Sequence, residues 1–202
     1  YQQAQASGYL FYSFLFIGAG SLFFPQLTLF IPIFWIGAYS FQALTPKSFF
    51  GGLIGWTLPY WFLFGHAYFY GEIELFYQPF IELVTFHPIT LWNFPLWEIA
   101  TLGYLFLLFI VSSVHCLVAG YEDKIRTRSY LHFLIFLTFC IFVYILLQPA
   151  QTFHLLPLLL IGVSILTGHF VVLTNSRASN VFFICALTGL IFLFGFNVWM
   201  LL

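Results

Sequence analysis

Long apolar runs with almost no charge are the feature that most constrains this chain. Hydrophobic residues make up 62% of its 202 residues and charged residues only 5%, whereas an ordinary soluble domain carries about 25% charged residues. A soluble fold of this composition would expose far more apolar surface than soluble monomers tolerate. The chain is therefore predicted to use lipid as its solvent.

The same runs predict helices rather than strands. They are continuous instead of alternating with period two, and about 20 apolar residues cross a bilayer as a helix. We predict an all-α, polytopic bundle of seven spans that forms a single transmembrane domain over residues 1–202. The predicted spans are 7–24, 26–43, 46–70, 97–119, 129–147, 153–173 and 179–202.

Two local signals bear on the ends of the chain and of its helices. Thr45 can cap a helix and Pro46 suits a first turn, so the third span is predicted to begin there. The chain starts at Tyr1 rather than Met, and its first residues lack the order of a signal peptide. We expect an upstream part to precede it.

Seven spans separate the charged residues by sign. All five cations fall in three loops on one side, which the positive-inside rule makes cytoplasmic. These cations are Lys47, Lys124, Arg126, Arg128 and Arg177. Four of the six acids, Glu72, Glu74, Glu82 and Glu98, fall on the other side.

The segment YEDKIRTR, residues 121–128, contains three of the five cations and admits three interpretations. The leading one is that Lys124, Arg126 and Arg128 orient the protein in the membrane. The second is a clamp for anionic lipid headgroups, which basic residues at the cytoplasmic surface attract. The third is a catalytic site, favoured by the general suitability of Arg for phosphate.

Residues 71–96 are too polar to span a bilayer and too apolar to be fully exposed to water. Glu74, Gln78 and Glu82 recur every four residues, which predicts an amphipathic extracytoplasmic segment in the membrane interface. A polar cluster of these acids with two histidines could bind a cation or act as acid and base. The candidates are Glu72, Glu74, Glu82, Glu98, His66 and His87. The preferred interpretation is that the acids keep a surface helix solvated.

Histidines and glycines supply the remaining candidates. His115, His132 and His169 lie near the cytoplasmic ends of spans and are candidate metal or haem ligands, although an interfacial or packing role is preferred. We predict no metal site and no cofactor. Gly51 and Gly55 form a GxxxG motif, which predicts close helix packing within the protein or against a partner.

The order of three short loops, TPKS, KIRTR and NSRAS, carries a family resemblance. With its flanking apolar runs, most of residues 7–195 resembles an uncharacterised family of multi-span membrane proteins found in Bacteroidota. The resemblance implies a multi-pass protein of the inner membrane of a Gram-negative envelope. It supplies no catalytic residues.

The leading functional prediction is a non-enzymatic integral membrane subunit that packs within or anchors a larger envelope or bioenergetic complex. The first alternative is an enzyme or carrier for a lipid-linked phospho- or polyprenyl substrate, and the second is a haem-bearing subunit. Expected partners are the lipid bilayer, other membrane subunits and anionic lipids. A net charge of −1 and the lack of a basic tail argue against nucleic acid.

Overall fold

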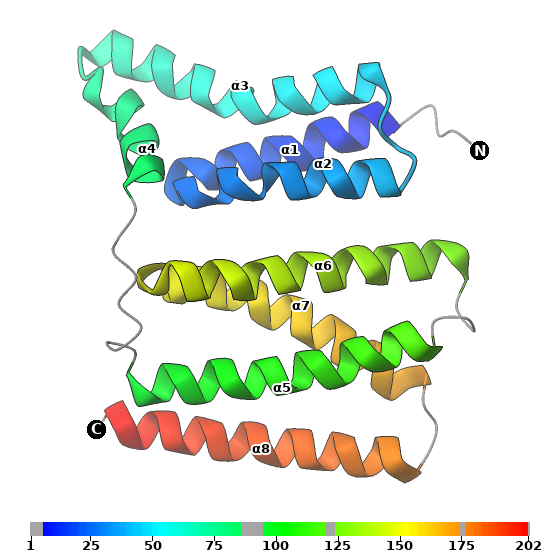
Figure 1. Cartoon of the computed structure of the whole chain (residues 1–202). Coiled ribbons are helices and arrows are strands. Elements are labelled where there is room, and N and C mark those ends of the chain that lie inside the picture. Colours follow the sequence, from blue (N-terminus) through cyan, green and yellow to red (C-terminus); the bar gives the residue numbers. More distant parts are fainter. Residues whose placement is uncertain (1–5, 86–94, 120–123, 174–176, 202) are drawn as a thin grey trace. The chain divides into compact units, whose positions relative to one another are not determined.

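The computed structural model describes residues 6–85, 95–119, 124–173 and 177–201. Within these ranges 93% of the residues are helical and none lies in a strand, which confirms the predicted all-α class. The chain divides into two compact units, Tyr1–Phe86 and His87–Leu202, where the sequence predicted one domain. Figure 1 shows the helices of each unit.

Unit 1 contains four α-helices and a short 3-10 helix. Their bounds are α1 Ala6–Phe23, η1 Pro25–Phe30, α2 Ile31–Ser40, α3 Pro46–Tyr70 and α4 Glu74–Val84. The predicted span 26–43 is thus divided into η1 and α2. Pro25 begins η1 and a second proline, Pro32, lies in the first turn of α2, where the missing N–H group does least damage to a helix.

Helix α3 begins and ends at recognisable local signals. The Ser48 amide donates to the Thr45 hydroxyl over 3.1 Å, and the Thr45 amide donates to the Ser48 hydroxyl over 2.7 Å. This reciprocal capping box, followed by Pro46, confirms the predicted start of the helix. After Tyr70 the chain turns at Gly71, whose φ of 73° is a left-handed conformation that glycine adopts without strain.

Close backbone contact holds α1 against α3. A Cβ atom on Gly18 would overlap the Trp56 carbonyl oxygen, and one on Gly55 would overlap the Phe11 carbonyl oxygen. Gly51 of the predicted GxxxG pair is less tightly placed, with the Ser7 carbonyl oxygen 3.4 Å from an added Cβ. One turn further along, the buried hydroxyls of Ser21 and Tyr60 are 2.8 Å apart. Small residues therefore allow an approach that side chains would block.

Within unit 1, helix α4 packs against α3 through aromatic side chains. The rings of Phe76 and Phe64 lie 5.3 Å apart and those of Phe80 and Tyr60 also 5.3 Å apart. Glu74, Gln78 and Glu82 follow one another on an exposed face. Of the predicted interfacial segment 71–96, residues 86–94 lie outside the described ranges.

Unit 2 contains four long helices and a second 3-10 helix. Their bounds are α5 Leu96–Ala119, α6 Ile125–Leu147, η3 Pro149–Gln151, α7 Thr152–Leu173 and α8 Arg177–Leu201. Helix α7 packs against both α5 and α6, and Leu155, Leu159 and Leu166 on it are almost wholly buried. Helix α8 lies beside α5 (Figure 1).

Four helices of the described chain are long and apolar enough to cross a membrane, fewer than the seven predicted. They cover Leu96–Val118, Ile125–Leu147, Pro149–Val172 and Ser179–Met200, all in unit 2. In unit 1, α1 contributes the shorter apolar stretch Ser7–Phe23, and η1 divides the second run. Helix α3 has the length, but its many Gly, Tyr and Trp residues lower its hydropathy.

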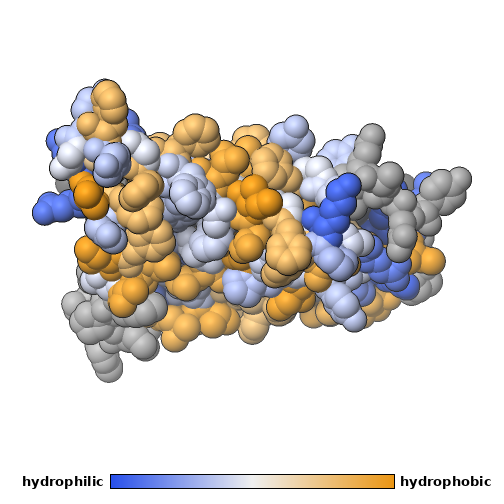
Figure 2. All heavy atoms as spheres, turned by 90° about the horizontal axis from the view of Figure 1, so that it is seen from above, coloured by the Kyte–Doolittle hydropathy of each residue, from blue (hydrophilic) through white to orange (hydrophobic). Residues whose placement is uncertain are grey.

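Apolar side chains dominate the surface. On the face drawn in Figure 2, hydrophobic residues are interspersed with mildly hydrophilic ones across the middle, and the most hydrophilic residues lie toward the two ends. Large exposed aromatic side chains include Phe16, Trp61, Phe192 and Trp199, each more than two-thirds exposed. Such a surface is suited to lipid or to other membrane helices rather than to water.

We predict that Gly55→Ala destabilises the pairing of α1 with α3 by about 1–3 kcal/mol, because its methyl group would collide with backbone rather than with a movable side chain. Reversible unfolding of purified protein in detergent would measure the loss. The matched control is Gly65→Ala on the same helix, where an added Cβ meets nothing within 4 Å. Equal stability of the two variants would contradict the close approach.

Candidate functional sites

Three of the four basic residues of unit 2 gather where α6 begins. The helix starts at Ile125, four residues before the predicted Ser129, so Arg126 and Arg128 are part of the helix and not of a loop. Lys124 is the N-cap residue and its side chain makes no capping hydrogen bond. All three cations are exposed, and no ion pair joins them to an acid within the described ranges.

The remaining cations and the acids occupy separate helix ends within each unit. Lys47 is in the first turn of α3, whereas Glu72 and Glu74 follow its far end. In unit 2, Arg177 begins α8 at the same end as the start of α6, and Glu98 is in the first turn of α5 at the other end (Figure 1). Each unit thus carries its cations at one end and its described acids at the other.

The described members of the candidate polar cluster are divided between the two units. Glu72, Glu74 and Glu82 are exposed in unit 1, where the Gln78 side-chain amide donates to the Glu82 carboxylate over 3.1 Å. His66 stacks on Tyr70, with their rings 4.6 Å apart. Glu98 belongs to unit 2, and His87 lies outside the described residues. A carboxylate bonded to a neighbouring amide on an exposed face fits the solvated-helix interpretation.

The three candidate histidine ligands occupy different surroundings. The His169 Nδ1 atom lies 3.7 Å from the Cys116 sulfur between α7 and α5, and the His115 ring packs edge-on against Phe170 at 4.4 Å. His132 is exposed on α6. Within the described ranges, no group of three or more His, Cys, Asp or Glu side chains is placed to hold a metal ion.

A polar seam inside unit 2 was not predicted from the sequence. We use this name for Thr101, Tyr104, Ser112 and Cys116 of α5 with their bonded partners on α7 and α8. The Ser112 and Thr167 hydroxyls lie 3.1 Å apart, and the Asn197 amide donates to the Thr101 hydroxyl over 3.0 Å. The Tyr104 hydroxyl donates to the Ala186 carbonyl oxygen.

The seam had a weak signal in the sequence. Its positions on α5 are separated by three, eight and four residues, with buried Leu105 and Leu108 between them, which is the spacing of one helix face. Hydroxyl and amide groups across a helix interface add directional bonds where apolar contact alone gives none. The seam therefore supports the association of α5 with α7 and α8, and no reaction chemistry follows from it.

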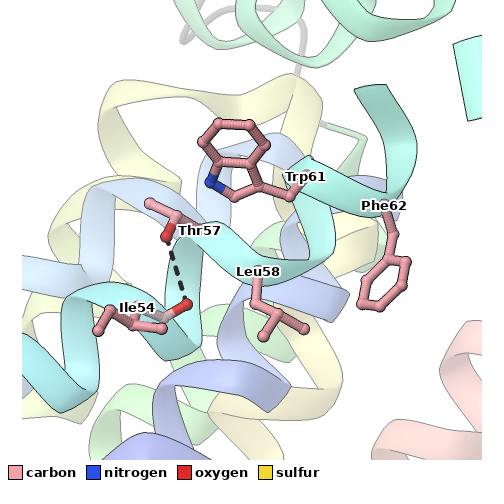
Figure 3. A pocket seen from close by; sticks show the side chains of 5 residues that line it. All are labelled: Ile54, Thr57, Leu58, Trp61 and Phe62. Carbon is pink, nitrogen blue, oxygen red and sulfur yellow. Dashed lines mark hydrogen bonds between the residues drawn. The ribbon is translucent and has the colours of Figure 1, made fainter. Parts of the chain in front are cut away.

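A shallow depression of about 380 Å³ lies on the outer side of α3. Figure 3 shows its lining, Ile54, Thr57, Leu58, Trp61 and Phe62. Its one hydroxyl, on Thr57, already donates to the carbonyl oxygens of Leu53 and Ile54 over 3.0 and 3.3 Å. The depression is an apolar surface feature and offers no group for catalysis.

Comparison of the chain with protein-family models, with curated proteins and with solved structures finds no significant match in any of the three.

Removing the Asn197 bond tests whether the seam stabilises α8. We expect Asn197→Ala to lower stability by about 0.6 kcal/mol, the average for hydrogen bonds between membrane helices. The measurement is reversible unfolding in mixed micelles. The control is Thr188→Ala on the same helix, because the exposed Thr188 hydroxyl bonds only its own helix at Ile184. A loss no larger than that of the control would contradict a stabilising role.

Proposed function

We propose that this protein is a non-enzymatic integral membrane subunit that packs within, or anchors, a larger membrane complex. The observation that carries the proposal is the exposure of α8. The 18-residue stretch that qualifies it as a span contains no buried residue, whereas 33–39% of the corresponding stretches in the other three spans are buried. A helix attached along one seam, with Phe192, Phe194 and Trp199 exposed, has ample surface for a neighbouring subunit.

The second candidate function is an enzyme or carrier for a lipid-linked phosphate substrate. It is favoured by the three exposed cations at the start of α6, because Arg forms paired hydrogen bonds with phosphate oxygens. It also requires a group that acts on the substrate, and the acids next to Lys124 in the sequence, Glu122 and Asp123, lie outside the described residues. The exposure of α8 favours the subunit proposal.

We further propose that unit 1 spans the membrane as well, which gives seven spans with the cations on the cytoplasmic side of a bacterial inner membrane. Helix α3 has 25 residues, about 37 Å at 1.5 Å per residue, and so exceeds the hydrocarbon thickness of about 30 Å. The separation of charge along α3 supports this orientation. The resemblance to the Bacteroidota family stays a prediction.

Site-specific labelling tests the topology of α3. Single cysteines at Gln42, Glu72 and Lys124 would be placed in a variant whose Cys116, Cys140 and Cys185 are replaced by alanine. With seven spans, a membrane-impermeant maleimide labels Glu72→Cys on intact spheroplasts, and it labels Gln42→Cys and Lys124→Cys only after permeabilisation. Labelling of Gln42→Cys and Glu72→Cys from the same side would show that α3 does not cross.

Extraction of the native protein in mild detergent, followed by mass spectrometry, tests the subunit proposal. We expect one or more other membrane proteins at a fixed stoichiometry. Introducing charge on the exposed face of α8 with Ile191→Lys should release them, because a cation in an apolar interface is costly. The control Phe183→Leu keeps the surface apolar. A chain that is extracted without protein partners, but with an enriched phospho- or polyprenyl lipid, would favour the second candidate.

A further inference from the structure

We propose that the start of α6 binds the phosphate headgroup of an anionic phospholipid through Lys124, Arg126 and Arg128. The inference rests on the proposed membrane integration of unit 2, and it is independent of whether the protein has subunit partners. It assigns a ligand class to the basic segment in addition to a role in orientation.

The depth of these residues in the membrane is the first argument. The candidate span Ile125–Leu147 has 23 residues, and about 20 are enough to cross the hydrocarbon core. The first turn of α6 therefore extends into the headgroup layer. Arg126 and Arg128 lie in or next to that turn, at the level where lipid phosphates are found.

The arrangement of side chains on the helix is the second argument. Arg128 and His132 are four residues apart on one face of α6 and are exposed, and the exposed Lys124 is the N-cap residue just before the helix. Arg126 projects from another side of the helix, so the helix presents cations to lipids on two flanks. Ammonium and guanidinium groups supply several N–H donors each, which match the acceptor oxygens of a phosphodiester.

The surroundings of the cations favour a lipid over a free phosphate ion. Ile125 is 75% exposed and Tyr130 is 53% exposed, so apolar and aromatic surface lies among the charges. A glycerophospholipid can cover this surface with its acyl chains while its phosphate meets the cations. Inorganic phosphate has no apolar part that could cover this surface.

Charge also favours direct contact with the lipid. In the sequence, Glu122 and Asp123 precede Lys124 and reduce the net charge of the segment to about one positive charge. Diffuse attraction to an anionic surface would therefore be weak. Retention of anionic lipid would depend on the particular side chains of the helix, and so on the identity of residues 126 and 128.

The test uses the purified full-length chain in nanodiscs that contain equal amounts of phosphatidylglycerol and phosphatidylcholine, with retained lipid identified by native mass spectrometry. We expect the wild-type chain to retain phosphatidylglycerol preferentially and at a defined stoichiometry. Removing both arginines in R126Q/R128Q should weaken that affinity roughly twenty-five-fold, at about fivefold for each cation near an anionic surface. The control K47Q, which removes an exposed cation at the start of α3, should leave retention unchanged.

Two further measurements complete the test. R126K/R128K keeps both charges and hence the orientation signal, and it should retain lipid better than R126Q/R128Q even if the latter inserts poorly. Excess inorganic phosphate should leave phosphatidylglycerol bound. The proposal is overturned if the wild-type chain shows no preference, if R126Q/R128Q or K47Q behaves contrary to expectation, or if inorganic phosphate displaces the lipid. Because no partner protein is present, failure here is distinguishable from failure of the subunit proposal.

Discussion

The lack of a hydrophobic driving force between helices in lipid governs this structure. Lipid tails are as apolar as the side chains they surround, so helices associate through close packing and a few directional bonds. Unit 1 relies mainly on close packing, at Gly18 and Gly55, where backbone meets backbone. Unit 2 adds the polar seam, in which hydroxyl and thiol groups of α5 meet polar groups of α7 and α8.

The same constraint explains where polar and charged side chains are found. Inside the helical units, several polar side chains bond to one another or to backbone, as Ser21 does with both Tyr60 and the Gly18 carbonyl oxygen. Charged side chains are confined to helix ends, where the headgroup region can solvate them. The described interior is therefore apolar with a few polar bonds, and the described charges lie at the helix ends.

Local signals predicted the helical class and both ends of α3, whereas the number of spans and the long-range contacts were not predicted correctly. Thr45, Pro46 and Gly71 mark the ends of α3 because caps and turns depend on neighbouring residues. The start of α6 was placed too late because charged residues in a first turn resemble a loop by hydropathy. The bond between Thr101 and Asn197 joins positions 96 residues apart, and a single sequence does not show which helices become neighbours. The basic segment was found as a charge cluster, but its helical register required the structure.

The division of the chain into two units has a consequence for biosynthesis. Helices α1, α3 and α4 contact one another within Tyr1–Phe86, and helices α5 to α8 contact one another within His87–Leu202. Domains generally fold as units, the N-terminal one first during synthesis. Unit 1 can therefore complete its helix packing while α5 to α8 are still being translated.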